Sequence, residues 1–153
     1  MLNLGPCAML PPHYHPRAAN YVVAVKGKTK TYMFEENGAR NVKATLTPGK
    51  ATIFPQGSMH MMENVGCEPA QLVSALNSED AGTNNIGNVF TNGFPPELVA
   101  AALGAKTEGM GAKVVPVGTG ANWGRAECLA RCGIDAKNNG TAKASRLRRA
   151  ASD

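Results

Sequence analysis

GKATIFPQGSMHMMEN, residues 49–64, predicts two short strands joined by a tight turn at residues 55–57. The second of these strands carries His60. HYHPRAANYVVAVKG, residues 13–27, lies earlier in the chain and carries the other two histidines. Together the two stretches contain all three histidines of the 153-residue chain.

The three histidines meet at one point if the two stretches form neighbouring strands. His13 and His15 point to the same face of a strand, because side chains alternate between faces. Antiparallel pairing of 11–18 with the strand of His60 would add the third imidazole on the inner face. Three neutral imidazoles with open positions are typical of a catalytic transition-metal site. From the residues alone, ordinary strand histidines remain the alternative.

The rest of the chain divides into a strand-rich part and a helical part. Short β-rich runs separated by turn signals fill residues 21–76, with Asn37-Gly38 as the strongest hairpin signal, and they predict a sandwich or barrel. Proline at the start and glycine at the end predict a helix over 95–104. A second helix is expected over 122–132.

Charge and hydrophobicity exclude several classes of protein. The net charge is +5, but residues 135–153 hold five Lys or Arg and two Asp, so the remaining domain carries only about +2. Such a basic tail is typical of disordered solvated chain, and we expect no nucleic-acid partner. No run approaches the ~20 apolar residues of a membrane span, and residues 1–10 lack the pattern of a signal peptide.

The two histidine stretches resemble the paired motifs of the cupin superfamily. The first motif is His-x-His, three or four residues, Glu, six residues and Gly; the second is G-x5-P-x-G-x2-H-x3-N. The resemblance is closest to the germin-like and spherulin-like branch, especially its fungal members, and covers about residues 4–134. The matching positions are His13, His15, position 20 and Gly27 in the first motif, and Gly49, Pro55, Gly57, His60 and Asn64 in the second.

The resemblance implies an all-β fold, a cupin jelly-roll β-barrel, over residues 1–92. Residues 93–134 would form a C-terminal helical segment of two short helices that packs on the barrel or on a neighbouring subunit, and 135–153 a disordered basic tail. It further implies one divalent metal ion, commonly manganese, in a secreted homo-oligomer.

The family does not decide whether this chain is an enzyme. One reading is an oxidoreductase or isomerase that acts on a small anionic substrate at the metal. The other is a non-enzymatic metal-binding protein of the cell-wall, spore-coat or storage type. A shared fold does not choose between them.

One departure from the motif changes the expected metal chemistry. The resemblance assigns the metal to His13, His15, His60 and position 20, where Asn20 replaces the family's Glu. Without a carboxylate, Mn²⁺ loses its best ligand, and preference shifts toward Zn²⁺, Fe²⁺, Cu²⁺ or Ni²⁺. Asn20 then acts as a weak fourth ligand, or it only hydrogen-bonds a metal-bound water or a ligand histidine.

A second departure is that the first motif begins almost at the amino terminus. Germin-like chains carry further strands and a signal peptide before it, so we expect an amino-terminally truncated chain with an open sheet edge.

The four cysteines suit an oxidised, secreted protein. Antiparallel pairing of the histidine strands would bring Cys7 opposite Cys67, which predicts a disulfide between them, with two buried thiols as the alternative. Cys128 and Cys132 would pair locally, or with a cysteine absent from the chain. Asn139-Gly140-Thr141 is a formal N-glycosylation acceptor.

Alternation along the strand places Met62 inside the barrel with His60, as pocket lining or core. Met59, Met61 and Glu63 should face outward. Arg17 either steers an anion toward the metal or is a solvated surface residue.

Overall fold

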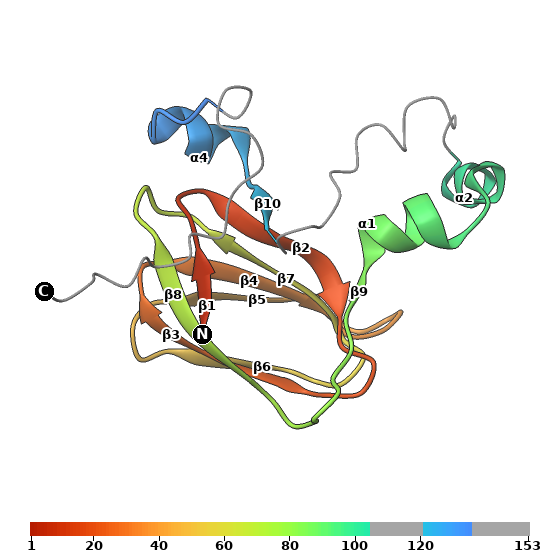
Figure 1. Cartoon of the computed structure of the whole chain (residues 1–153), viewed down its shortest axis with the longest axis horizontal. Coiled ribbons are helices and arrows are strands. Elements are labelled where there is room, and N and C mark those ends of the chain that lie inside the picture. The colour runs from red at the N-terminus through yellow and green to blue at the C-terminus, as the bar shows by residue number, and fades with distance from the viewer. Residues whose placement is uncertain (105–120, 136–153) are drawn as a thin grey trace, which may run out of the picture.

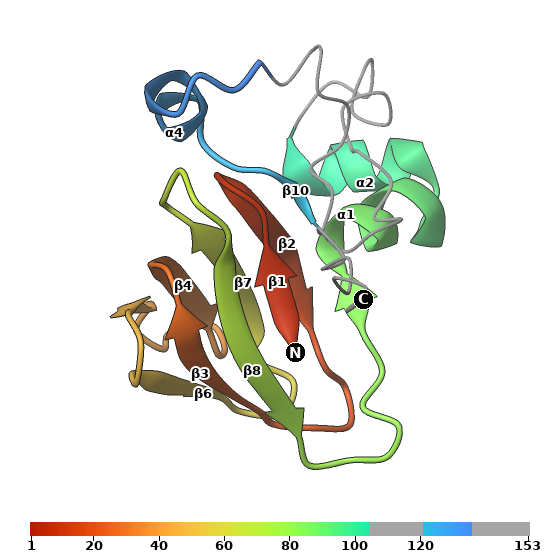
Figure 2. The ribbon, with the colours of Figure 1, turned by 60° about the vertical axis from the view of Figure 1, so that its left-hand side comes forward.

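The computed structural model describes residues 1–104 and 121–135. Two antiparallel sheets face each other and enclose the core (Figures 1 and 2), so the expected all-β jelly-roll barrel is confirmed. One sheet has the order β1-β8-β3-β6, and the other has the order β10-β2-β7-β4-β5 with β9 beside β2. The strands are β1 (Leu2–Leu4), β2 (Ala8–Tyr14), β3 (Asn20–Lys26), β4 (Thr29–Phe34), β5 (Val42–Leu46), β6 (Ala51–Phe54), β7 (Met59–Asn64), β8 (Ala70–Leu76), β9 (Asn84–Asn85) and β10 (Asn122–Trp123).

Turn chemistry sets the strand boundaries as the sequence predicts. Gly38 adopts φ +87° in the connection between β4 and β5, and Gly57 adopts φ +78° in the turn between β6 and β7. Both values lie in the region that favours glycine. β4 then pairs with β5 from Thr29↔Leu46 to Met33↔Val42.

The inward faces of both sheets form one hydrophobic core. Alternation along each strand sends every second side chain into this space. Its fully buried large side chains include Leu4, Val22, Leu46, Phe54, Met62 and Leu72.

The expected pairing of the two histidine strands is confirmed. β2 runs antiparallel to β7 with His13 opposite His60, and the register shifts between Leu10 and His13. As a result Met9 faces Glu63.

The prediction of a Cys7–Cys67 disulfide is wrong. The structure joins Cys7 to Cys128 and Cys67 to Cys132. Cys7 lies in the turn before β2 beside Gly66, whose carbonyl accepts its backbone N–H at 3.2 Å. Cys67 lies beyond the end of β7 in the turn to β8. The expected local pairing of Cys128 with Cys132 is also wrong, because Cys128 is bonded to Cys7 and Cys132 is bonded to Cys67.

The helical segment differs in part from expectation. α2 (Pro96–Leu103) matches the first predicted helix, and Gly104 ends it with φ +62°. The second begins later than predicted: residues 122–123 are strand β10, which pairs with β2, and helix α4 covers only Ala126–Arg131. Two unpredicted elements, α1 (Ile86–Asn88) and the π-helical turn η1 (Val89–Gly93), lead from β9 to α2. Figure 1 shows α2 and α4 at opposite ends of the barrel.

The tail predicted over 135–153 lies outside the described residues from position 136 onward, and so does the glycosylation acceptor at Asn139. The division at residues 92 and 134 stays a prediction. Within the described ranges, no helix is long and apolar enough to cross a membrane.

Candidate metal centre

Three imidazoles meet inside the barrel. His13 lies on β2, His15 follows the end of that strand, and His60 lies opposite on β7. The ring centroids are 4.4 Å apart for His13 and His60, 5.3 Å for His13 and His15, and 5.4 Å for His15 and His60. One nitrogen from each ring lies within 4.8 Å of the others, which is close enough for all three to bind one metal ion.

Backbone carbonyls fix the orientation of all three rings. Nδ1 of His13 lies 2.8 Å from the Pro11 carbonyl oxygen. Nδ1 of His15 lies 2.7 Å from that of Gly82, and Nδ1 of His60 lies 2.9 Å from that of Ser58. A carbonyl only accepts, so each Nδ1 carries the proton and each Nε2 keeps a free lone pair. This is the tautomer that binds a metal through Nε2.

The Nε2 atom of His60 is buried and has no hydrogen-bonding partner. A buried polar atom without a partner is costly, and few exist in native proteins. A metal ion between the three rings would accept this lone pair. The donor set therefore fits a divalent transition metal.

Burial favours the neutral form of two of the rings. Desolvation lowers the pKa of His13, against an opposing hydrogen bond to Pro11, and the charge of a protonated His15 would lower it further. Desolvation likewise lowers the pKa of His60 to about 4. Neutral imidazole is the form that binds metal.

Asn20 faces this centre from the other sheet. It is the first residue of β3, it is 2 % exposed, and it lines a cavity of about 200 Å³ together with His13 and His15. The Ser74 hydroxyl donates a 2.7 Å hydrogen bond to Oδ1 of Asn20. The remaining lining is Leu2, Leu10, Met62, Ser74, Leu76, Thr83 and Asn85.

Sequence reasoning missed several residues of this site. Phe54 stacks on His60 with centroids 4.1 Å apart and ring planes 8° apart. Ser74 comes from β8, a strand in which no motif marks it. Only the alternation of β8 against β3, which pairs Ser74 with Val22, could have placed it on the inner face.

Other residues weighed in the sequence have structural roles. Arg17 forms an ion pair with Asp80 at 2.9 Å and does not line the cavity, so the structure does not bring it to the metal centre. Asn64 is fully buried, and its Nδ2 donates to the carbonyl oxygens of Leu4, Gly5 and Glu68.

Glu63 faces outward from the barrel as predicted, yet it is only 3 % exposed. Arg125 covers it with hydrogen bonds of 2.7 and 3.0 Å to Oε2. This ion pair and the Tyr32 hydroxyl beside it raise the pKa of Arg125.

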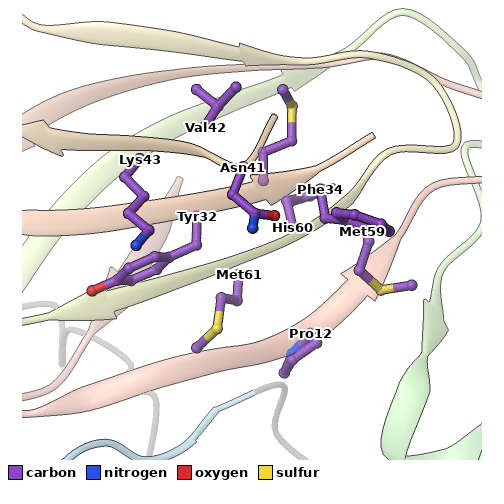
Figure 3. Close-up of a pocket in the computed structure, with 10 residues that line it drawn as sticks. Pro12, Tyr32, Phe34, Asn41, Val42, Lys43, Met59, His60 and Met61 are labelled. Carbon is purple, nitrogen blue, oxygen red and sulfur yellow. The ribbon is translucent and has the colours of Figure 1, made fainter. Parts of the chain in front are cut away.

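A separate apolar pocket of about 250 Å³ lies on the outer face of the six-stranded sheet (Figure 3). Met59 and Met61 line it with Tyr32 and Phe34, whereas Met62 lines the inner cavity. The predicted alternation of the three methionines is therefore confirmed.

The sequence matches the model of the family described as Cupin over residues 1–110. It is 40% identical to Spherulin-1A of Physarum polycephalum over 97 residues, covering 63% of this chain and 39% of the relative. It is 36% identical to Spherulin-1B of the same organism over 132 residues, which covers 84% of this chain and 52% of the relative. It is 34% identical to Germin-like protein subfamily 3 member 2 of Arabidopsis thaliana over 110 residues, which covers 71% of this chain and 48% of the relative. The chain thus spans about half the length, or less, of these curated relatives.

Two solved structures share the fold. An oxalate oxidase superposes with a TM-score of 0.70 at 24% identity, over 74% of this chain and 60% of that chain. The oxalate decarboxylase of Bacillus subtilis superposes with a TM-score of 0.71 at 18% identity, over 80% of this chain and 31% of that chain. At these identities the likeness shows the fold alone, while the sequence comparisons confirm the resemblance to spherulins and germin-like proteins.

Proposed function

This chain belongs to the cupin family, and on that premise we propose that it binds one divalent transition-metal ion through Nε2 of His13, His15 and His60. One observation carries the proposal: three backbone carbonyls fix the three Nδ1 atoms, and Nε2 of His60 is buried without a partner. The ion is manganese by family resemblance. Zinc, iron, copper or nickel are the alternatives, because Asn20 supplies no carboxylate.

The neutral donor set favours an anionic ligand. With three imidazoles and an amide around it, a bound divalent ion keeps its full charge and acts as a Lewis acid toward an anion. The cavity of about 200 Å³ admits only a small molecule. As an enzyme, the protein would therefore be an oxidoreductase or isomerase of a small anionic substrate.

In this proposal the chain's own residues position the reactants. Phe54 stacks on His60 and holds the ring in place. Ser74 holds Oδ1 of Asn20, which leaves the two Nδ2 hydrogens as donors to an anion. Leu2, Leu10 and Leu76 supply an apolar wall that excludes water from one side of the cavity.

A non-enzymatic role of the cell-wall, spore-coat or storage type is supported by a different observation. Among the described residues that line the cavity there is no carboxylate, Lys or Arg, and the three histidines are committed to the metal. General acid–base catalysis needs a free titratable group near the substrate. In this case the metal mainly links the two strands that carry its ligands.

Metal analysis of the purified protein tests the site. We expect about one ion per chain, lost in His60→Ala and retained in Met62→Ala. Met62 is the matched control, since it is equally buried on β7 and lines the cavity but offers no nitrogen ligand. Folded wild-type protein that takes up no metal ion contradicts the proposal.

The enzymatic and non-enzymatic roles are separated by metal removal. A chelator abolishes turnover in the first case and only lowers Tm in the second. Small carboxylates are the substrates to screen, with oxalate included because both structural neighbours act on it.

We also propose that the protein is secreted and forms a homo-oligomer. Two disulfides among the described residues suit an oxidising compartment. Tyr21, Ile53 and Val73 lie side by side on the outer face of the four-stranded sheet and are 51%, 58% and 43% exposed. Such apolar patches mark interfaces. Light scattering of wild type and Ile53→Lys tests this, and an unchanged mass excludes this face as the interface.

A further inference from the structure

The four cysteines form one cluster at the end of the barrel below α4. Cys7 lies in the turn before β2, and Cys67 lies in the turn between β7 and β8. Cys128 lies in α4, and Cys132 ends that helix. The cluster therefore joins three segments that are distant in sequence.

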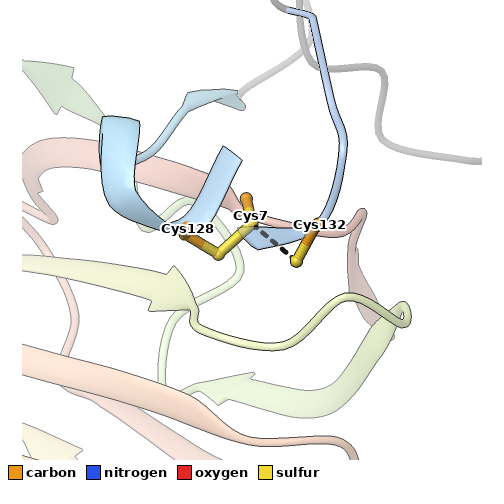
Figure 4. Close-up of side chains that lie close together, drawn as sticks. All are labelled: Cys7, Cys128 and Cys132. Carbon is orange, nitrogen blue, oxygen red and sulfur yellow. Dashed lines mark hydrogen bonds between the residues drawn. A yellow bond between two sulfur atoms is a disulfide. The ribbon is translucent and has the colours of Figure 1, made fainter. Parts of the chain in front are cut away.

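The two disulfides of this cluster touch. The Sγ atom of Cys132 lies 3.5 Å from the Sγ atom of Cys7, which is bonded to Cys128 (Figure 4). Cys132 is itself bonded to Cys67. The distance between Cys132 and Cys7 is close to the van der Waals contact of two sulfur atoms. A thiolate at Cys132 would therefore lie within reach of the Cys7–Cys128 bond.

The two bonds differ in their access to solvent. Cys67 is exposed and Cys132 is partly exposed. In contrast, Cys7 is 0% exposed and Cys128 is 5% exposed. A reductant in solution consequently meets the Cys67–Cys132 bond first, and reaches the other bond only through Cys132.

Backbone contacts hold Cys7 as the target. Its N–H donates to the Gly66 carbonyl at 3.2 Å, and its carbonyl accepts from the Gly124 N–H at 2.7 Å. Its φ of +53° is rare for a residue with a side chain. These constraints keep the Cys7 sulfur beside Cys132.

We propose that this cluster is a site of intramolecular thiol–disulfide exchange, which passes reduction from the exposed bond to the buried one. A thiolate of an external dithiol attacks Sγ of Cys67, and the electron pair of the broken bond goes to Sγ of Cys132. The second thiol of the reductant then displaces Cys67, which leaves as a thiol while the reductant becomes a disulfide.

The second step is internal. The Cys132 thiolate attacks Sγ of Cys7, a Cys7–Cys132 bond forms, and the Cys7–Cys128 bond breaks with its electron pair on Cys128. Nη2 of Arg131 lies 3.5 Å from that sulfur. A guanidinium beside a thiolate stabilises it, which favours Cys128 as the leaving group.

One equivalent of dithiol thus yields free thiols at Cys67 and Cys128 and a new bond between Cys7 and Cys132. The helix α4 remains attached to the barrel throughout, because Cys132 replaces Cys128 as its anchor. The link from this helix to the β7–β8 turn is lost.

Two matched variants test the exchange. Cys67→Ser and Cys132→Ser remove the same exposed bond, but only the first leaves a thiol in contact with Cys7. Each protein is held at pH 8, quenched in acid, alkylated and digested with trypsin. Cleavage after Arg125 and Arg131 separates the peptides of Cys128 and Cys132.

We expect Cys67→Ser to contain both Cys7–Cys128 and Cys7–Cys132, the latter in at least about one molecule in ten. Cys132→Ser should contain Cys7–Cys128 alone with Cys67 free. A single Cys7–Cys128 bond in both variants overturns the proposal. So does a comparable fraction of Cys7–Cys67 in Cys132→Ser, since pairing would then not follow contact.

The wild-type protein gives the same answer if a variant fails to fold. After one equivalent of dithiothreitol, the proposal expects alkylation at Cys67 and Cys128. Alkylation confined to Cys67 and Cys132 overturns it.

Discussion

Ser74 donates its hydroxyl hydrogen to Oδ1 of Asn20 at 2.7 Å, linking β8 to β3 beside the three histidines. The amide oxygen that would replace the family's carboxylate as a ligand is therefore already an acceptor. This contact supports a role for Asn20 as a donor to an anion rather than as a metal ligand. Substitution at position 20 separates the two roles.

Asn20→Glu should raise the affinity for Mn²⁺ by about tenfold or more, which corresponds to ~1.4 kcal/mol, because a hard ion gains a carboxylate ligand. Isothermal titration of the metal-free protein measures this. Asn20→Gln is the matched control, as it changes the length without adding charge. Equal Mn²⁺ affinities for Glu and Gln at this position would place the side chain away from the ion.

The metal-free protein should lose stability as the pH falls from 6.5 toward 4. The pKa of His60 is lowered from 6.5 to about 4, so the unfolded chain binds a proton in this window that the folded chain does not. His60 then contributes stability that is complete above pH 6.5 and lost on acidification. A pKa difference of about 2.5, at ~1.36 kcal/mol per pH unit, amounts to roughly 3 kcal/mol.

Urea denaturation at pH 7.5 and 4.5 measures this loss. His60→Gln serves as reference, because carboxylates also titrate below pH 5, and its loss should be smaller by that amount. Identical losses in the two proteins would show that His60 does not titrate as the burial implies.

We expect Asn64 to contribute to the stability of the fold, although it belongs to the motif that carries His60. Its Nδ2 donates to three carbonyl oxygens, and its Oδ1 accepts from the Gly66 N–H at 2.9 Å. Asn64→Asp keeps the shape but turns an oxygen toward those carbonyls, and we expect a loss of about 3 kcal/mol from the buried acceptors left without donors. Urea denaturation of the metal-free protein at neutral pH measures it. A loss below about 1 kcal/mol would show that the turn rearranges to satisfy these groups.

Gly27 should tolerate substitution less well than Gly38. Both have positive φ, +82° and +87°. A Cβ at Gly27 would lie 2.9 Å from Cα and Cβ of Ala70, whereas nothing lies within 4 Å of one at Gly38. Gly38→Ala should therefore cost about 1 kcal/mol for its backbone conformation, and Gly27→Ala about 3 kcal/mol or more. Thermal unfolding of the pair shows the difference, and similar costs would mean that β8 moves to make room.

The histidine centre can be predicted from the sequence because the spacing of its residues along each strand is visible there. His13, His15 and His60 follow from two-residue alternation and one strand pairing, and the structure brings them together. The motif marks Gly27, and the structure supplies the reason, its close approach to Ala70.

Several contacts that the sequence did not predict involve segments far apart in the chain. The exact register of β2 against β7 is not visible in the sequence, and in the structure Cys7 lies beside Gly66 rather than being bonded to Cys67. No pattern near Glu63 indicates that Arg125 will cover it, since the two are 62 residues apart. The alternation of side chains along a strand does not indicate which residues of the C-terminal segment will pair with that strand or bond to it.

The pairing of β10 with β2 has a consequence for synthesis. Asn122 lies opposite Met9, so a strand near the amino end of the chain receives its neighbour more than a hundred residues later. A ribosome makes the chain from the amino end, and long-range strand pairs close slowly. The Ala8–Met9 part of β2 therefore stays without this neighbour in the nascent protein until translation has passed residue 123, whereas β9, which is made earlier, already pairs with β2 at His13 and Tyr14.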